Sequence, residues 1–385
     1  MTSPAELMNE LRAIATDVGI DAVGVTTADR FVEAQRAIED RKARGLNADM
    51  VFTYGRPERA ADPQRILPGA RSIVVGIRAY GYADPRAPSG PQARVARYVR
   101  EDEYGALTSG LEAIADRLRA AGEVAEVVLD QNRLIDRAAA YRAGLGWLGH
   151  NTNLLHPDLG SWIVLGSVVT TAVLPHADRP IDDGCGTCRR CQQECPTGAL
   201  DELGVLDANK CLAWLVQSDG VFPAEYRIAL GDRLYGCDDC QEVCPVNPEL
   251  QPSSAGSVAV ALSVKPASRS AHVAVIDLLS RSDDELTAEF GHWYIPRRRP
   301  AYLRRNALIV LGNSPAANSP GGSEATVEAL KSALCHDSWV VRAHAVWAAK
   351  RLGLVELLDV VAGDSAPEVQ DELRRVVQEA SGGQP

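Results

Sequence analysis

The chain lacks any apolar run of about 18 residues, the length that a membrane-spanning helix needs. No G-x-G-x-x-G stands at an expected strand-to-helix turn, where the pattern would mark a nicotinamide or flavin site. Basic residues are outnumbered, 40 against 51 acidic ones, which gives a net charge of −11 and argues against broad attraction to nucleic acid. Its first hydrophobic stretches are too short for a signal peptide. We therefore expect a cytoplasmic protein without a membrane partner.

Cysteine, in contrast, occurs nine times, and eight of these residues lie between positions 185 and 244. In a cytosolic chain such clustering indicates metal binding rather than disulfides. The first four form C-x2-C-x2-C-x3-C before Pro196, the run of bacterial ferredoxins in which the fourth cysteine binds a second cluster. A second run, C-x2-C-x3-C before Pro245, is one ligand short, and Cys211 can supply it.

The spacing predicts two [4Fe–4S] clusters. Cluster one takes Cys185, Cys188, Cys191 and Cys244, and cluster two takes Cys195, Cys211, Cys237 and Cys240. The alternative is a pair of structural zinc sites, which usually have C-x2-C knuckles with longer gaps. The ninth cysteine, Cys335, stands alone on an expected helix and is predicted to be a buried, inert thiol. Two adjacent clusters conduct single electrons, so the chain is predicted to be a redox protein.

Helical and strand patterns alternate over residues 1–175 and predict an α/β or α+β domain. Expected helices cover 5–19, 30–44, 105–121 and 134–143, and expected strands cover 21–27, 72–77, 123–130 and 162–170. The cysteines fall in 176–250, a linker is expected at 251–272, and 273–385 looks wholly helical. There, the segment at 304–311 resembles that at 342–349, an offset of 38 residues that is close to a HEAT-type period. An ordinary small helical domain is the alternative.

Five segments carry a likeness to a known family: Arg59–Ser72, Ala143–Leu154, Cys185–Leu200, Gly236–Pro245 and Arg305–Asn313. Together they resemble the epoxyqueuosine reductases, cobalamin-dependent iron–sulfur enzymes of tRNA modification, over about residues 45–360. The resemblance implies an α+β protein in three parts. These are a cobalamin-binding α/β domain related to reductive dehalogenases, a ferredoxin-like double-cluster domain, and HEAT-like helical repeats.

The resemblance also implies a reaction, the reduction of epoxyqueuosine to queuosine at the wobble position of the tRNA anticodon loop. The epoxide loses its oxygen at the expense of two electrons and two protons. An external donor such as flavodoxin or ferredoxin would supply the electrons, and a monomer is expected. A general acid must protonate the departing oxygen. Asp130, which closes the expected strand at 123–130, matches the family's acid, and its alternative role is to cap the next helix.

Cobalamin is expected in a base-off form without a protein histidine ligand, because no D-x-H-x-x-G occurs among the seven histidines. The family's corrin-lining positions match Arg59, Tyr98, Asp130, Lys210, Asp238 and Asp239. The alternatives are solvated surface charges and, for Tyr98, core packing. An arginine-rich patch is predicted to bind tRNA phosphates, unless it pairs with nearby acidic residues: Arg297, Arg298, Arg299, Arg304 and Arg305.

The chain departs from the family pattern in several places, which include Gln131–Arg133 in place of small residues and Gly105 in place of a histidine after Tyr104. His150 replaces the usual lysine, Asp136-Arg137 replaces a Glu-Arg pair, and Ala213–Gln217 replaces a Ser-Tyr-Leu-Thr-like run. We expect these changes to affect the tRNA side rather than the clusters or the corrin. They leave two other functions open: a cobalamin and iron–sulfur reductase of a small molecule, and an electron-transfer protein without cobalamin.

Overall fold

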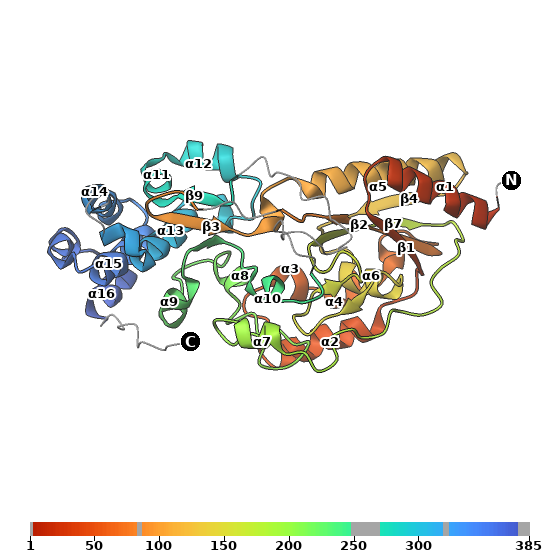
Figure 1. The fold of residues 1–385 in the computed structure, drawn as a ribbon, viewed down its shortest axis with the longest axis horizontal. Coiled ribbons are helices and arrows are strands. Elements are labelled where there is room, and N and C mark those ends of the chain that lie inside the picture. Colours follow the sequence, from red (N-terminus) through yellow and green to blue (C-terminus); the bar gives the residue numbers. More distant parts are fainter. Residues whose placement is uncertain (1–2, 83–86, 248–269, 319–322, 376–385) are drawn as a thin grey trace, which may run out of the picture. The chain divides into compact units, whose positions relative to one another are not determined.

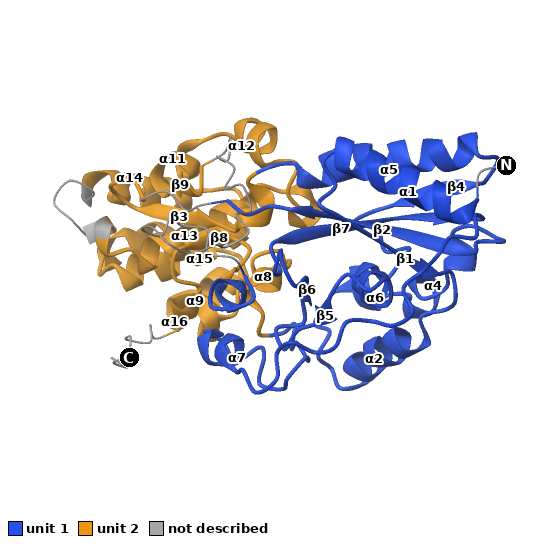
Figure 2. Ribbon diagram, turned by 45° about the vertical axis from the view of Figure 1, so that its right-hand side comes forward, with its two compact units in different colours: residues 1–84, 101–209, 239–268 blue, residues 85–100, 210–238, 269–385 orange. Residues whose placement is uncertain are grey.

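The computed structural model describes residues 3–82, 87–247, 270–318 and 323–375. Two compact units form, each from three separate segments of the chain (Figure 2). Unit 1 comprises residues 1–84, 101–209 and 239–268, and unit 2 comprises 85–100, 210–238 and 269–385. The expected linear division at 1–175, 176–250, 251–272 and 273–385 stays a prediction, and residues 251–269 of the expected linker lie outside the described part.

Unit 1 contains a four-stranded antiparallel sheet with the strand order β1-β2-β7-β4. Its strands are β1 (Ala22–Thr27), β2 (Ser72–Ala79), β4 (Ala125–Val128) and β7 (Ile163–Thr170). Strand β2 is central and pairs along its full length with β7, for example Val75 with Ser167. Because β2 is covered on both faces, nearly all of it is buried, and its sequence is an almost unbroken apolar run.

Helices cover both faces of this sheet (Figure 1). Helices α1 (Pro4–Asp17) and α5 (Glu103–Ala120) lie on one face, and α6 (Asp136–Arg142) lies on the other, on the side of α2 (Val32–Ala43). The side chains of β2 alternate between the two faces, as in any strand. Ile73, Val75 and Ile77 join the core that contains the alanines of α6. The helices and strands expected over residues 1–175 are thus confirmed, with small shifts of their ends.

The remaining elements of unit 1 are short. They are α3 (Val51–Tyr54), α4 (Pro57–Ala60), the 3-10 turn η1 (Pro63–Arg65), β5 (Trp147–Leu148), β6 (Leu154–Leu155), α7 (Arg190–Glu194) and α10 (Asp239–Glu242). Strands β5 and β6 pair as a two-stranded antiparallel hairpin. Helices α7 and α10 pack against each other, although they are far apart in the sequence. These short pieces carry four of the predicted site residues of unit 1: Arg59, Cys191, Asp239 and Cys240.

Unit 2 contains a three-stranded sheet in the order β8-β3-β9. Strand β3 (Gln92–Val95) pairs in parallel with β8 (Arg233–Tyr235) and antiparallel with β9 (His272–Ala274). The long helix α13 (Ala301–Asn313) is buried from Ala301 to Gly312. Because α13 is buried on all sides, it has no polar face toward solvent. Its polar residues therefore also point into the unit.

The other helices of unit 2 pack around α13. They are α8 (Leu212–Leu215), α9 (Arg227–Leu230), α11 (Val275–Ser280), α12 (Asp283–Phe290), α14 (Ser323–Leu334), α15 (Trp339–Arg351) and α16 (Pro367–Arg374), with 3-10 turns at Arg97–Val99, Ala224–Tyr226, Pro296–Arg298, Pro315–Asn318 and Val355–Val361. Helix α15 packs against α13, α14 and α16. In the described residues after Ala274 all regular elements are helical, as predicted, and the HEAT-like repeat stays a prediction.

One expectation about unit 2 is wrong. Cys335 was expected to be buried, but it is exposed. It directly follows α14, and its backbone N–H closes the last turn by donating to the carbonyls of Lys331 and Ser332. The buried face of this helix is formed by Leu330, Ala333 and Leu334 instead. Cys335 therefore lies off the apolar stripe.

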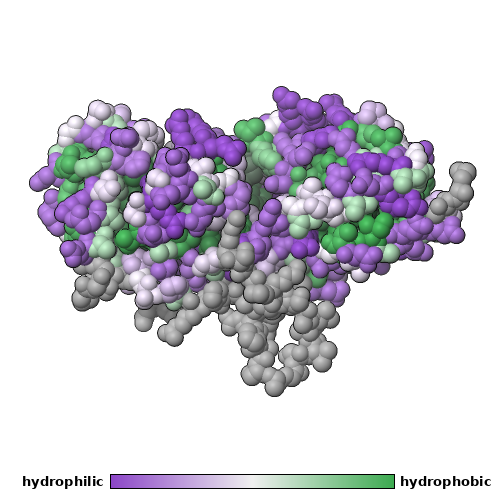
Figure 3. Space-filling view, turned by 90° about the horizontal axis from the view of Figure 1, so that it is seen from above, coloured by the Kyte–Doolittle hydropathy of each residue, from purple (hydrophilic) through white to green (hydrophobic). Residues whose placement is uncertain are grey.

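No helix in the described part of the chain is long and apolar enough to cross a membrane. The face of the molecule shown in Figure 3 carries mostly hydrophilic residues, with smaller hydrophobic patches between them.

Candidate functional site

The four cysteines predicted to hold cluster one gather in unit 1. Cys185, Cys188, Cys191 and Cys244 line one cavity, together with His150 and its neighbours. Cys191 lies on α7 and Cys244 follows α10, so the packing of these two helices brings the two cysteine runs together. This grouping agrees with the one predicted from the spacing.

The electrostatics of the cavity fit a bound cluster. Burial, and then the neighbouring Cys244, raises the pKa of the Cys191 thiol. Burial also raises the pKa of Cys244, and Cys185 and Cys188 add to this effect. Buried thiolates so close together repel one another unless positive charge binds between them. Thiolates are the ligands of iron–sulfur clusters, so the donor set suits such a cluster.

The ligands predicted for cluster two are divided between the units. Cys195 and Cys240 belong to unit 1, and Cys211 and Cys237 belong to unit 2. Within unit 1, the backbone N–H of Ala199 donates to the Sγ of Cys195 at 3.2 Å. The grouping of these four cysteines around a second cluster stays a prediction.

The segment at residues 144–151 ends at the cluster-one cavity, which His150 and Asn151 line. Gly144 follows α6 with a φ of 70°, a conformation that suits glycine. Gly146 lies so close to β6 that an added Cβ would be 2.3 Å from the Leu155 carbonyl oxygen. The glycines thus allow the tight β5–β6 hairpin. This hairpin brings Trp147 and His150 to the cysteines, and the indole N–H of Trp147 donates to the Sγ of Cys185 at 3.4 Å.

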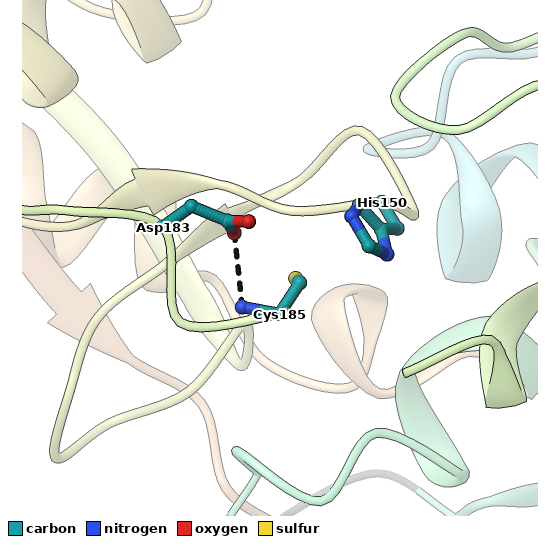
Figure 4. Close-up of side chains that lie close together, drawn as sticks. All are labelled: His150, Asp183 and Cys185. Atoms are coloured by element: carbon teal, nitrogen blue, oxygen red, sulfur yellow. Dashed lines mark hydrogen bonds between the residues drawn. The ribbon is translucent and has the colours of Figure 1, made fainter. Parts of the chain in front are cut away.

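Figure 4 shows His150 and Asp183 beside Cys185. The carboxylate of Asp183 accepts a hydrogen bond from the backbone N–H of Cys185 at 2.9 Å. Nδ1 of His150 lies 2.9 Å from the Cys188 carbonyl oxygen. Ligand atoms of His150, Asp183 and Cys185 lie within 4.8 Å of one another, close enough to share a metal ion, and they belong to the cluster-one site. The expectation that the change to His150 stays away from the clusters is therefore wrong.

A second group of polar side chains lies where strand β4 leads to helix α6. Asp130 adopts a φ of 46°, a left-handed conformation that is uncommon for residues other than glycine and often occurs at functional sites. Asp136 is the first residue of α6, and its buried Oδ1 has no hydrogen-bond partner in the described part of the chain. The residue that caps α6 is Ile135, so Asp130 does not have the alternative role of helix cap.

The environment of these carboxyls favours their protonated form. Burial, and then the charge of Asp130, raises the pKa of Asp136 to about 8. Burial also raises the pKa of Asp130. On α5, burial and then the charges of Asp130 and Asp136 raise the pKa of the Tyr104 hydroxyl. Carboxyls whose charges interact titrate as a pair. Such a pair can retain a proton near neutral pH, as a general acid must.

The residues predicted to line the corrin are also divided between the units. Arg59 and Asp239 belong to unit 1 with Asp130, whereas Tyr98, Lys210 and Asp238 belong to unit 2. Arg59 is exposed on α4, which allows the alternative of a solvated charge. Asp239 is buried at the start of α10, so that alternative is wrong for Asp239.

The same alternative is wrong for Asp238, which is buried in unit 2. Its Oδ2 accepts a hydrogen bond from the backbone N–H of Arg97 at 2.8 Å and lies 3.7 Å from the guanidinium of Arg97. The hydroxyl of Tyr98 accepts a hydrogen bond from the Gln217 amide at 3.3 Å. Lys210 is half-buried. A role for these residues in binding a corrin stays a prediction.

The predicted arginine patch separates into two parts. Arg297, Arg298 and Arg299 are exposed. Arg304 is buried and pairs with Asp283, whereas Arg305 is fully buried. Burial lowers the pKa of Arg305 to about 9.

The guanidinium of Arg305 donates to four backbone carbonyls of the segment at 215–220: those of Leu215, Val216, Ser218 and Gly220. A guanidinium used in this way is not available to RNA. The phosphate-binding prediction therefore does not hold for Arg304 and Arg305, which have an internal role.

Two residues of the site were not recognised from the sequence as functional. From the sequence, Asp136 is only part of a changed Glu-Arg pair. Trp147 is only part of the segment Ala143–Leu154, which resembles the family. The position of Asp136, six residues after Asp130, is a local signal that places Asp130 in the loop before α6 and Asp136 at the first residue of that helix. Trp147 has no such signal, because Cys185 is 38 residues further along the chain.

Comparisons with known proteins agree with this geometry. The family model described as a 4Fe-4S double cluster binding domain matches residues 184–247. The chain is 34% identical to an epoxyqueuosine reductase of Bacillus cereus over 330 residues, 82% of each chain. It is 32% identical to the epoxyqueuosine reductase of Bacillus subtilis, covering 90% of this chain and 88% of that one.

Solved structures show the same likeness. A crystal structure of epoxyqueuosine reductase with an epoxyqueuosine-modified tRNA-Tyr stem loop matches with a TM-score of 0.83 and 29% identity, covering 96% of this chain and 97% of that one. A Bacillus subtilis structure, whose catalytic aspartate loop is swung out of the active site, matches with the same TM-score and identity. The expected relation to reductive dehalogenases stays a prediction. From its identity to these relatives over most of their length, the chain belongs to the epoxyqueuosine reductase family.

Proposed function

We propose that this chain reduces epoxyqueuosine to queuosine at the wobble position of tRNA. The observation that carries this proposal is the match, over 96% of the chain, to an epoxyqueuosine reductase bound to an epoxyqueuosine-modified stem loop. Unit 1 supports it with the two features that a reductive deoxygenation needs. These are a four-cysteine cavity suited to an electron-transfer cluster and a pair of carboxyls whose pKa values are raised by burial.

Asp130 is the proposed general acid. The oxygen of the epoxide leaves as water, so it must gain two protons while the ring carbons gain two electrons. Asp130 lies in a left-handed turn after β4. Its carboxyl therefore belongs to the loop between β4 and α6 and not to the helix. Asp136, with its pKa of about 8, is a second carboxylic acid close by. The pair can deliver one proton at a time, and a proton taken up from solvent before the second transfer keeps both carboxyls from being ionised together.

Cobalamin is the proposed acceptor of the cluster electrons, bound base-off without a histidine ligand. When bound, its low-valent cobalt supplies a strong one-electron reductant and nucleophile. Arg59, Tyr98, Lys210, Asp238 and Asp239 are the residues proposed to hold it. Two [4Fe–4S] clusters and an external donor such as flavodoxin or ferredoxin complete the electron path. The monomeric state and the cytoplasmic location remain predictions.

Exposed arginines of unit 2 are the proposed tRNA contacts. Arg297 and Arg299 line an open pocket of about 370 Å³ with Tyr302 and Trp339. Arg297 pairs there with Asp219, and both side chains remain largely accessible. Guanidinium groups bind phosphate, and aromatic rings stack on unpaired bases. Tyr302 is buried, so the exposed arginines and the half-buried ring of Trp339 are the groups that offer these two kinds of contact to an anticodon loop.

An assay on defined substrates tests the function. Anaerobically purified protein, supplied with cobalamin and a one-electron reductant, is incubated with epoxyqueuosine-containing tRNA, and the nucleosides are quantified by mass spectrometry. Queuosine should appear with tRNA and much more slowly with the free nucleoside. Rapid conversion of the free nucleoside alone would favour the small-molecule reductase. No binding of cobalamin would leave an electron-transfer protein, and failure to form queuosine in a loaded enzyme would overturn the proposal.

A further inference from the structure

Trp147 makes a specific contact with a predicted cluster ligand. Its side chain is 7% exposed, and its indole N–H donates to the Sγ of Cys185 at 3.4 Å. The ring also lies directly over Gly184, where an added Cβ would be 2.6 Å from the indole. The chain therefore has a glycine immediately before Cys185, where any larger residue would displace the ring.

Further contacts hold the segment of Trp147 in place. Two residues later in the chain, Gly149 pairs through its backbone N–H with the Asn153 carbonyl at 2.8 Å, which closes the hairpin. Nδ1 of His150 lies 2.9 Å from the Cys188 carbonyl oxygen, and the Asn151 amide donates to the Cys240 carbonyl at 3.4 Å. The contacts of His150 with Cys188 and of Asn151 with Cys240 therefore fix the segment that directs the indole N–H at the sulfur.

Other groups near Cys185 do not replace this donor. The backbone N–H of Cys185 is engaged by the Asp183 carboxylate at 2.9 Å. That carboxylate adds negative charge near the sulfur, and negative charge makes it harder to add an electron. An N–H directed at a ligating thiolate has the opposite effect, because it stabilises the more negative, reduced state of the cluster. Trp147 therefore counteracts Asp183.

We propose that Trp147 sets the reduction potential of the cluster held by Cys185, Cys188, Cys191 and Cys244, through its indole hydrogen bond to the Cys185 sulfur. Trp147 is a positioning residue in this role, because it acts through the ligand. The step is the addition of one electron to the oxidised [4Fe–4S]²⁺ cluster, which gives [4Fe–4S]⁺ without bond making or proton transfer. The inference rests on the proposed cluster and adds how this chain controls electron supply.

The test compares two tryptophan variants. Trp147→Phe retains an aromatic ring and removes the N–H donor. The matched control is Trp162→Phe, in the same unit, where the ring stacks edge-on against Tyr80 instead of lining the cluster-one cavity. After iron and sulfide analysis, each protein is titrated anaerobically with dithionite and followed by electron paramagnetic resonance. In Trp147→Phe the midpoint reduction potential of one cluster should become more negative. In the control the midpoint potentials of both clusters should stay unchanged. Unchanged midpoints in a fully loaded Trp147→Phe protein would overturn the proposal.

A second measurement covers the case in which Trp147→Phe loses iron. Wild-type protein and the Trp162→Phe control are produced with ¹⁵N-indole tryptophan, and pulsed paramagnetic resonance is recorded on the reduced clusters. Both should show a ¹⁵N coupling to one cluster, and its absence would overturn the role of Trp147. Wild-type protein without iron would instead contradict the cluster assignment itself, together with this inference. The two failures are therefore distinguishable.

Discussion

At the scale of single residues, the turn between β4 and α6 combines an unusual backbone with unusual acidity. Asp130 has a φ of 46°, and the nearby Asp136 carries a buried oxygen without a partner in the described residues. Strained backbone and unsatisfied polar atoms both cost stability, on the order of 1–3 kcal/mol each. Their occurrence together in one short turn agrees with the proposed catalytic role of Asp130.

Replacing Asp130 tests the proton donor. Asp130→Asn has the same size and polarity but cannot release a proton. We expect turnover on epoxyqueuosine tRNA to fall roughly 10²–10⁴-fold, the usual contribution of a general acid. Iron content should stay near wild type, because Asp130 is distant in sequence from the cysteine runs. Near-normal turnover would remove Asp130 as the donor.

The raised pKa of Asp136 predicts a pH dependence. An acid with a pKa of about 8 is protonated at neutral pH and ionises as the pH rises through that value. The second ionisation also requires two like charges close together. Single-turnover rates of pre-reduced enzyme should therefore decline as the pH rises through about 8. Asp136→Asn should lower the rate and remove its decline with pH. Asp136→Glu should keep the wild-type rate and its decline with pH. A decline that persists unchanged in Asp136→Asn would assign it to another group.

At the scale of elements, helix α13 shows how a charged residue becomes structural. Arg305 lies on a face that is buried on every side and satisfies four carbonyls of the segment at 215–220. Its neighbour Asn306 donates to the carbonyls of Val216 and Leu234. Two polar side chains thereby tie this segment and β8 to the helix. This gives a physical reason for the adjacent Arg305 and Asn306 within α13.

Removing Arg305 should therefore destabilise unit 2. Arg305→Ala leaves several buried carbonyls without donors, and each such group costs about 1–3 kcal/mol. We expect a loss of at least about 3 kcal/mol in the free energy of unfolding, measured by urea denaturation followed by circular dichroism. Arg298→Ala, at an exposed position nearby, is the control and should change stability by less than about 0.5 kcal/mol. Equal stabilities of the two variants would contradict the internal role of Arg305.

At the scale of the whole molecule, the cysteine count predicts the metal content. Two [4Fe–4S] clusters contain about eight iron and eight sulfide per chain. Cys211→Ser should lose or degrade one cluster, whereas Cys335→Ser, at an exposed site outside the motifs, should leave the iron content unchanged. Iron and sulfide analysis of anaerobic protein measures both. Zinc without iron in the wild-type protein would contradict the cluster prediction.

The exposed arginines predict how tRNA binding depends on salt. Reversing charge at Arg297 and Arg299 to glutamate should weaken tRNA binding and flatten its salt dependence, because each lost phosphate contact reduces counterion release. Lys331→Glu, on the exposed side of α14, is the control and should bind normally. Cobalamin binding should survive in both. An unchanged affinity at low salt would show that Arg297 serves only its pairing with Asp219.

The sequence predicted the parts of the structure that depend on local patterns. Strand β2 was recognised because its apolar run is continuous, and α5 because its apolar residues recur at helical spacing. Cys185, Cys188 and Cys191 were predicted to share a metal centre because two residues separate each from the next, and Cys244 was added from the ferredoxin pattern, in which one ligand comes from the other run. Neither the exposure of Cys335 nor the burial of Arg305 was predicted, because burial depends on what packs against a residue.

The sequence alone predicted four helices and four strands of the first 175 residues, the two cysteine runs as metal ligands and, through its motifs, the family. These features follow from spacing within a few residues of the chain. Only the tertiary structure decided that Trp147 donates to Cys185, that Asp130 and Asp136 interact, and that Arg304 and Arg305 serve packing while Arg297 and Arg299 remain exposed. Hydrogen bonds, desolvation and charge interactions act through space, and the partners in each case are brought together by folding.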